Sequence, residues 1–398
     1  MDRKSAGKTS PSHSTLLKSP VAFGKYRLLG RLGRGGMAEV YLARPRGQRR
    51  LVAIKCIRKK LAGERQYLDM FVREGKLAVQ LNNEAIVKTH EIGHVSRRHF
   101  ICMEYISGVD LNLILKRCRA SRRQHLPVPH ALHIAMRACE GLHYAHELND
   151  SRGKSLKVVN RDVSPSNVRL SYDGDVKLLD FGIAKAKSGL SSEIGVVKGK
   201  ISHMSPEQVR GLPVDRRSDI FATGIVLHEM LTLEKLFRGD SEFQIMDAVR
   251  RAEVKPPSMI NHRVSAKVDE LVLRALHKDP AERYQTADEM ADALREVLTP
   301  YNFSRAELRD LVRDLCREEW KQEQRVVEIC LAGEPGDQPD GGLDEDYGEF
   351  LEILEDDDPL MTTAEREARV TPRWMHLLLF FSVLLLLSAV ALVVYTRG

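Results

Sequence analysis

The sequence has few cysteines and no arrangement of them that binds metal. Its six cysteines are scattered over 398 residues, with no Cys-x-x-Cys pair and no cluster with histidine. This spacing indicates reduced thiols and argues against a zinc site or a disulfide scaffold. Glycine (27) and proline (16) are too few for a fibrous or wholly disordered chain. No apolar run lies near the N-terminus, so no secretory signal peptide is expected.

Charge is spread unevenly along the chain. The formal net charge is +7, but residues 331–373 hold 14 acidic and 3 basic side chains, a net −11 that leaves +18 elsewhere. A basic body can attract nucleic acid, an anionic membrane surface or an acidic partner. Because no RRM, zinc-finger or helix-turn-helix signature occurs, nucleic acid is not expected as a partner.

Composition and periodicity divide the chain into segments. Residues 1–22, rich in Ser, Lys and Pro, predict a flexible basic arm. Residues 23–300 alternate strand-like and then helix-like patterns and predict the main folded unit. Residues 301–331 carry apolar residues at helical spacing after a Ser-x-x-Glu capping box, so a helical extension is expected. Residues 332–373 predict an acidic linker.

The last apolar segment predicts a transmembrane helix at residues 374–396. Its core, 377–395, is 19 residues without a charge. As a helix this core spans about 28 Å, close to the ~30 Å hydrocarbon layer of a bilayer. Arginines dominate its N-terminal side, Arg366, Arg369 and Arg373 against Arg397. The sequence therefore predicts a single-pass protein of the cell membrane with its body in the cytoplasm; a buried core helix is the alternative.

Two features before the middle of the chain are candidate functional elements. Residues 26–43 read as two alternating runs joined by glycines, a hairpin whose turn can approach a phosphate chain; the alternative is an ordinary turn, and no GxxxxGK[ST] P-loop occurs. Lys55 lies in the apolar run 51–57 and needs an acidic partner, because a buried ammonium is costly. Glu74 on the following amphipathic helix is the expected partner; the alternative is an exposed Glu. Gly75 beside it costs about 1 kcal/mol relative to Ala and suggests mobility.

Two further segments, 158–170 and 176–184, each set an aspartate beside strand-like apolar residues. With the earlier features they match the protein-kinase signature motifs in order over about residues 26–298. The matching residues are Gly33, Gly35 and Val40 of the glycine loop, Lys55 of VAIK, Arg161, Asp162 and Asn167 of RDxxxxN, Asp180 of DFG, Ser205 to Glu207 of SPE, Asp219 and Arg283. The chain thus resembles bacterial serine/threonine protein kinases of the eukaryotic type.

The resemblance implies an α+β, bilobal kinase-like fold: a small antiparallel β lobe with one helix (about 23–106) and a larger helical lobe (about 107–300). It implies ATP with Mg²⁺ or Mn²⁺ between the lobes, the metal held by Asn167 and Asp180. Asp162 would accept or orient the substrate hydroxyl. The nucleotide site would comprise Leu32, Gly33, Gly35, Gly36, Val40, Ala53, Lys55, Glu104, Asn167 and Asp180.

Three architectural residues come with the resemblance. Glu207 and Arg283 are expected to form a buried ion pair in the helical lobe, and Asp219 to accept backbone N–H bonds from the catalytic loop. Asn160 replaces the usual histidine of HRD, but its amide can still bond backbone near Asp180. Ala38 replaces the third glycine, and its methyl group fits if the loop arches slightly.

A paired departure concerns the catalytic aspartate. Ser164 stands where serine/threonine kinases usually carry lysine, and Lys200 stands where they carry threonine. We expect an exchange in which Lys200 supplies the cation and Ser164 the hydroxyl; the alternative is drift toward a weak or silent pseudokinase that still binds nucleotide. The activation segment has no threonine, so autophosphorylation is expected at Ser191 or Ser192.

The expected function is that of an ATP-dependent, membrane-anchored protein kinase. It would phosphorylate Ser and Thr hydroxyls of protein substrates, and itself, in cytoplasmic signalling. A homodimer is a further expected partner, although the apolar segment lacks a GxxxG packing motif.

Overall fold

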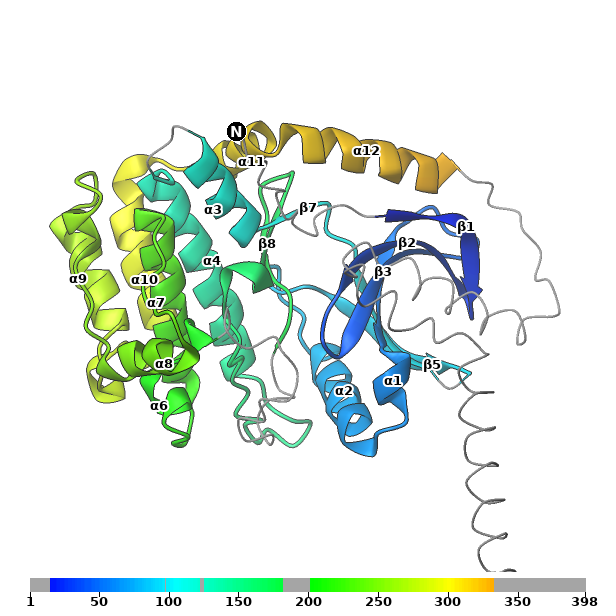
Figure 1. Ribbon diagram of the computed structural model, residues 1–398, viewed down its shortest axis with the longest axis horizontal. Coiled ribbons are helices and arrows are strands. Elements are labelled where there is room, and N and C mark those ends of the chain that lie inside the picture. The colour runs from blue at the N-terminus through cyan, green and yellow to red at the C-terminus, as the bar shows by residue number, and fades with distance from the viewer. Residues whose placement is uncertain (1–14, 97, 122–124, 182–200, 333–398) are drawn as a thin grey trace, which may run out of the picture. The chain divides into compact units, whose positions relative to one another are not determined.

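The computed structural model describes residues 15–96, 98–121, 125–181 and 201–332, which lie in one compact unit, residues 1–337 (Figure 1). Within these ranges no helix is long and apolar enough to cross a bilayer. The predicted transmembrane segment 374–396 lies outside the described residues, as does nearly all of the predicted acidic linker 332–373.

The N-terminal lobe is a six-stranded antiparallel sheet with strand order β1-β2-β3-β4-β6-β5. Its strands carry aromatic and β-branched side chains, and the paired residues Tyr41 and Ile54 of two central strands are fully buried. Helices α1 and α2 lie against the same side of the sheet (Figure 1). The elements are β1 (Thr15–Phe23), β2 (Tyr26–Arg34), β3 (Ala38–Pro45), β4 (Val52–Ile57), α1 (Lys59–Ala62), α2 (Arg65–Ala78), β5 (Thr89–Val95) and β6 (Arg98–Glu104).

Two expectations for this lobe need correction. The end of the predicted flexible arm forms strand β1, which pairs antiparallel with β2. The local composition did not predict strand β1, because tertiary contacts stabilise it. Phe23 is fully buried against Phe100, and Leu16 packs on a cluster around Leu42. The lobe also holds a second, one-turn helix, α1, in addition to the expected α2.

The C-terminal lobe is helical and carries a small sheet in the order β7-β8-β9. Side-chain caps start several of its helices, for example Asp110, whose carboxylate accepts from Leu113 N at 2.8 Å at the start of α3. Helix α7 is the centre of the lobe, with 15 of its 17 residues buried. The elements are β7 (Gly108–Asp110), α3 (Leu111–Ala120), α4 (Val128–His146), β8 (Val168–Ser171), β9 (Val176–Leu178), α6 (Pro206–Val209), α7 (Arg216–Thr232), α8 (Glu242–Arg251), α9 (Ala266–Ala275) and α10 (Ala287–Leu298).

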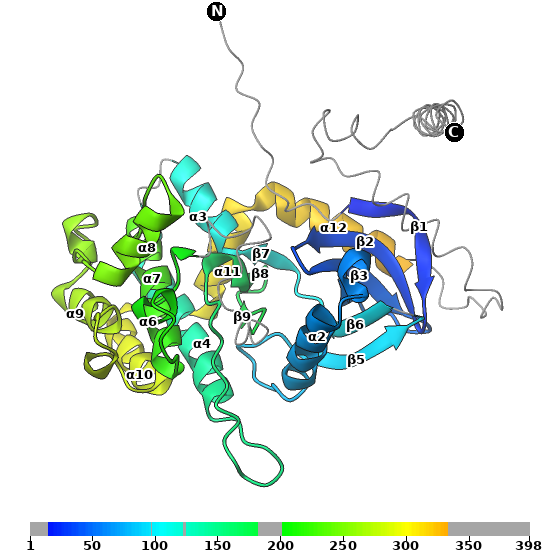
Figure 2. The same ribbon diagram turned by 60° about the horizontal axis from the view of Figure 1, so that its bottom comes forward.

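The extension after the helical lobe is two helices, α11 (Arg305–Leu315) and α12 (Arg317–Ala332). The predicted capping box is present, since Glu307 Oε1 accepts from Ser304 N at 3.3 Å. Helix α11 packs against α3 and β8, and α12 continues from it past β7 toward β1 in both views (Figures 1 and 2). The extension therefore contacts both lobes.

Candidate active site

Three charged side chains from distant segments meet between the lobes. Lys55 Nζ on β4 lies 2.7 Å from Glu74 Oε1 on α2 and 2.9 Å from Asp180 Oδ1 after β9. The predicted Lys55–Glu74 pair is thus present, and both side chains are largely buried, 13% and 14% exposed. Burial alone lowers the pKa of an ammonium, but the carboxylates of Asp180 and Glu74 outweigh it, so the pKa of Lys55 is raised and the lysine stays charged.

Gly75 explains how α2 comes close enough to present Glu74. A Cβ at Gly75 would lie 2.5 Å from Ile92 Cδ1 and 3.1 Å from Ile101 Cγ1. The residue is buried, so the glycine serves close packing of α2 on the sheet and not the mobility that its helix propensity suggested. That close packing sets the distance between Glu74 and Lys55.

Strand pairing and a turn hydrogen bond fix the register of the glycine hairpin β2–β3. Gly33 pairs with Val40, and Gly35 N donates to Ala38 O at 2.8 Å across the turn. Ala38 is buried, 6% exposed, in the cluster that includes Phe71. Its methyl group is therefore accommodated by packing inside the lobe.

The segment joining the lobes begins at Glu104. Its carboxylate accepts from Lys88 N at 2.8 Å and from Lys177 Nζ at 2.5 Å. These partners hold the Glu104 side chain, so Glu104 would contact a nucleotide through its backbone atoms. Ala53, 6% exposed on β4, pairs with Met103 in the neighbouring strand.

The catalytic loop is anchored from beneath by Asp219 of α7. This fully buried carboxylate accepts from Asn160 N and Arg161 N, both at 2.8 Å, and lies 2.7 Å from His146 Nε2. Arg161 has φ of +63°, a left-handed conformation that costs a side-chain-bearing residue about 1–2 kcal/mol. The expected bonds from the loop to Asp219 are present and hold the strained residue next to Asp162.

Asn160 and Asn167 fix the loop to the residues around it. Asn160 Nδ2 donates to Asp180 O at 3.1 Å, the bond expected for the amide that replaces histidine, and Asp162 N donates to Asn160 Oδ1 at 3.0 Å. Asn167 Nδ2 donates to Asp162 O at 2.8 Å. Hydrogen bonds, two of them made by Asn160, therefore join Asp162, Asn167 and Asp180 in one cluster.

Asn167 and Asp180 offer the oxygen donors that Mg²⁺ prefers, an amide and a carboxylate. Among the described residues no group of three or more His, Cys, Asp or Glu could hold a metal by itself. A site with one carboxylate and one amide suits a cation that takes its other ligands from phosphate and water. The donor set fits the predicted metal.

The exchange between Ser164 and Lys200 stays a prediction, because Lys200 lies outside the described residues, as do Ser191 and Ser192. Ser164 is buried, 5% exposed, with its Oγ 3.0 Å from Ser166 Oγ. The Ser164 hydroxyl is therefore buried within the catalytic loop, next to Ser166.

The expected Glu207–Arg283 ion pair is present in the helical lobe. Arg283 Nη1 and Nη2 donate to the two oxygens of Glu207 at 2.9 and 3.0 Å, and the Arg283 side chain is fully buried. Three backbone carbonyls accept the other guanidinium N–H groups: those of His277, Arg217 and Lys278. Although burial opposes ionisation, the bonds from Arg283 and Ser218 hold the pKa of Glu207 below its ordinary value.

Two positioning residues were not predicted from the sequence. His146 at the end of α4 contacts Asp219, and Gln208 Nε2 of α6 donates to Arg161 O at 3.2 Å. Both are ordinary polar residues on helices, His146 on α4 and Gln208 on the one-turn α6. Gln208 directly follows the SPE motif, but the sequence gave no partner for it.

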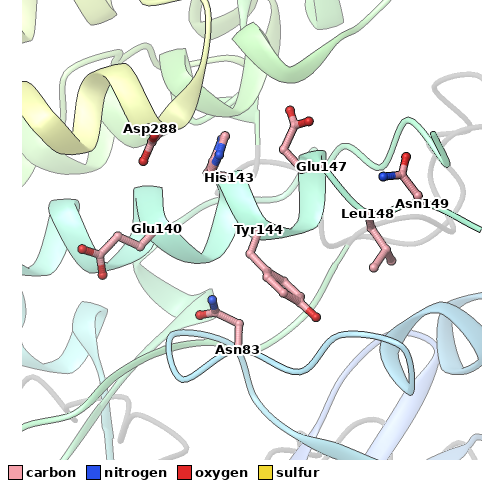
Figure 3. A pocket seen from close by; sticks show the side chains of 8 residues that line it. All are labelled: Asn83, Glu140, His143, Tyr144, Glu147, Leu148, Asn149 and Asp288. Atoms are coloured by element: carbon pink, nitrogen blue, oxygen red, sulfur yellow. The ribbon is translucent and has the colours of Figure 1, made fainter. Parts of the chain in front are cut away.

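Two hollows lie near α4 and between the lobes. One of about 20 Å³, room for about one water molecule, is bordered by Lys55, Glu74 and Asp180. A larger one, of about 440 Å³, includes none of the predicted site residues (Figure 3). Its lining residues are Asn83, Glu140, His143, Tyr144, Glu147, Leu148, Asn149 and Asp288. The predicted site residues Lys55, Glu74 and Asp180 therefore border the smaller hollow and not the larger one.

Comparison with known proteins agrees with this geometry. The protein kinase domain family matches residues 26–294. The tyrosine-protein kinase MasK of Myxococcus xanthus is 41% identical over 70% of this chain and 44% of its own length. A probable serine/threonine-protein kinase of Streptomyces coelicolor is 39% identical over 67% of this chain and 39% of its own length. The serine/threonine-protein kinase PknB of Mycobacterium tuberculosis is 37% identical over 72% and 44%.

Solved structures give the same result. The crystal structure of the Mycobacterium tuberculosis PknI kinase domain superposes with a TM-score of 0.53 at 27% identity, covering 70% of this chain and 98% of that one. The matched region spans less than half the length of the curated relatives. Since the family match includes both lobes and every residue of the cluster around Lys55, the chain belongs to the protein kinase family.

Proposed function

We propose that this chain transfers the γ-phosphoryl group of ATP to serine and threonine hydroxyls of proteins. The observation that carries the proposal is the position of Lys55 Nζ, within 2.9 Å of carboxylates from both α2 and the segment after β9. A cation fixed there can hold the phosphates of ATP, and Asn167 and Asp180 would hold Mg²⁺, which neutralises phosphate charge when bound. Phosphoryl transfer needs this positioning and neutralisation more than covalent chemistry.

The acceptor side of the reaction falls to Asp162. Its loop is held by Asp219 and by Asn167, which donates to Asp162 O at 2.8 Å. A carboxylate held this way can orient the acceptor hydroxyl and take its proton as the new P–O bond forms. Asp162 contributes placement of the nucleophile, and Lys55 contributes placement of the phosphates.

The experiment is phosphoryl transfer by the full-length chain. With labelled ATP and Mg²⁺, the wild type is expected to label itself and a generic protein substrate, while Asp162→Ala and Lys55→Ala lose most of the label. Asp292→Ala, at an exposed position of α10, is the matched control and should label normally. Equal labelling by the wild type and Asp162→Ala would contradict the proposal.

Tyrosine is a second candidate acceptor. Ser164 stands in place of the lysine usual in serine/threonine kinases, and the 41% identical relative from Myxococcus xanthus is named a tyrosine-protein kinase. Analysis of phosphoamino acids in the labelled product distinguishes the two: phosphoserine and phosphothreonine support the first candidate, and phosphotyrosine alone supports the second.

The proposed cellular setting is the inner face of the cell membrane, with a single span at residues 374–396 and the kinase domain in the cytoplasm. The uncharged core 377–395 and the arginines on its N-terminal side support this. The full chain should stay with membranes through alkaline carbonate washing, and a chain ending at residue 373 should not. Release of both chains would contradict the anchor.

Autophosphorylation at Ser191 or Ser192 and a homodimer complete the proposal. The activation segment offers serine and no threonine, and Arg161 beside Asp162 can pair with a phosphate. Phosphopeptide mapping of an active preparation should find one of these serines modified, and cross-linking in membranes should give a dimer. An active chain with both serines unmodified would refute the first expectation, and a purely monomeric chain the second.

A further inference from the structure

Helix α12 contacts both lobes. Near its start, Glu319 is buried and bonds to Arg117 of α3 in the C-terminal lobe. At its end, Cys330 O accepts from Arg44 Nη1 of β3 in the N-terminal lobe at 2.9 Å. Figures 1 and 2 both show α12 passing β7, where the lobes are joined. A change in the angle between the lobes would therefore have to break contacts of this helix.

Glu323, near the middle of α12, bonds to the segment that joins the lobes. Glu323 Oε1 accepts from Tyr105 Oη at 2.5 Å and from Gly108 N at 3.2 Å. Burial and the nearby Glu323 carboxylate raise the pKa of Tyr105, so its phenol remains a donor. One carboxylate oxygen thus accepts bonds from both ends of the stretch 105–108.

The end of α12 also supports the glycine hairpin. Val326 and Leu32 pack on the same cluster, which contains Leu29, Leu42 and Cys330. Leu32 is one of the residues expected to border the nucleotide. The helix therefore touches two parts of the nucleotide site from outside, the joining segment and strand β2.

We propose that Glu323 is a positioning residue for nucleotide binding, which fixes the joining segment through Tyr105 and Gly108. The inference rests on the proposed function and assigns the α11–α12 extension to the nucleotide site. A segment held in its binding conformation before the ligand arrives loses less conformational entropy on binding, so the affinity is higher. The backbone of Asp162 bonds to Asn160 and Asn167, whereas Glu323 bonds to the joining segment, so turnover at saturating ATP should change little.

The test compares variants of the full-length chain by calorimetric titration with a non-hydrolysable ATP analogue and Mg²⁺, and by steady-state kinetics. Glu323→Ala should raise the Kd of the analogue and the KM for ATP about tenfold, as expected for losing two bonds to one charged acceptor, with kcat within about twofold. Glu323→Gln keeps an acceptor oxygen and should restore most of the affinity. The matched control is Glu328→Ala, which removes the same charge from an exposed position of α12.

A second variant keeps the test decisive if Glu323→Ala does not fold. Tyr105→Phe removes one of the two donors and by itself should raise the Kd about threefold. Where Glu323→Ala does fold, adding Tyr105→Phe to it should have no further effect. An unchanged Kd in Glu323→Ala, or an equal loss in Glu328→Ala, would overturn the inference while leaving the kinase function in place. A wild-type chain that binds no nucleotide would overturn the proposed function itself.

Discussion

Asp219→Asn tests whether the catalytic loop depends on one buried carboxylate. The carboxylate is fully buried and accepts from Asn160 N and Arg161 N at 2.8 Å, with His146 Nε2 at 2.7 Å. The amide keeps a single acceptor oxygen. If that oxygen stays with Asn160 and His146, which share Oδ2, the NH₂ group faces the N–H of Arg161.

The magnitude follows from that lost bond. A bond to a charged acceptor contributes about 1.5–3 kcal/mol, and an unsatisfied buried N–H costs about 1–3 kcal/mol, so the expected loss of unfolding free energy is about 3 kcal/mol. At an unfolding entropy of about 2.1 cal/mol/K per residue, that is about 5 °C in Tm for a folded unit of roughly 300 residues. Because Arg161 is the strained residue next to Asp162, its release should also lower kcat at least tenfold.

The assays are thermal unfolding by circular dichroism and phosphoryl-transfer kinetics on the full-length chain. Asp247→Asn is the matched control, a partly exposed aspartate paired with Arg251 within α8, and should shift stability by less than about 0.5 kcal/mol. An Asp219→Asn variant that keeps its kcat and unfolds within 2 °C of the wild type, a Tm shift on the order expected for a surface change, would refute the anchoring role of Asp219.

Three other predictions concern stability. Arg283→Met leaves Glu207 buried without its cation and should lower the unfolding free energy by about 3–5 kcal/mol in urea titration; a loss below about 1 kcal/mol would contradict the role of the pair. Burial, with a smaller effect of a nearby arginine, lowers the pKa of His133 to about 4 from 6.5, so the folded protein binds this proton less readily than the unfolded chain. The contribution of His133 to stability should therefore be full above pH 6.5 and fall between pH 6.5 and about 4, by up to about 2–3 kcal/mol allowing for partial exposure. His133→Gln should flatten this pH dependence of the unfolding free energy. Identical pH profiles for the variant and the wild type would contradict the role of His133. Gly108→Ala places a Cβ 2.1 Å from a backbone carbonyl of β8 and should unfold at least about 5 °C lower, whereas Gly63→Ala, which meets nothing within 4 Å, should not; equal Tm values would show that the backbone yields.

Motif chemistry determined much of the site from sequence alone. A lysine in an apolar strand needs an acid, and the structure pairs Lys55 with Glu74 at 2.7 Å. An amide can replace the HRD histidine as a donor, and Asn160 does so toward Asp180 O at 3.1 Å. The Ser304–Glu307 capping box is a local pattern, and a helix begins there. Such inferences hold because the chemistry of a residue limits what it can do when buried.

Other features depended on contacts that no local pattern records. Strand β1 has the composition of a loop, yet it pairs with β2 because Phe23 and Leu16 find apolar partners. In the sequence, Gly75 is consistent with mobility and with close packing alike. The 2.5 Å between a Cβ placed at Gly75 and Ile92 Cδ1 decides for close packing. Helix propensity and strand pattern describe a residue's neighbours in sequence, whereas these outcomes depend on its neighbours in space.

The sequence by itself determined the family resemblance, the charged cluster at Lys55 and the presence of a helical extension after the helical lobe. Only the tertiary structure decided where that extension packs. Tyr105 and Glu323 are 218 positions apart, and neither has a sequence pattern that names the other. Their bond exists because α11 packs on the C-terminal lobe and directs α12 across the joining segment, so its physical cause is the packing of distant apolar surfaces.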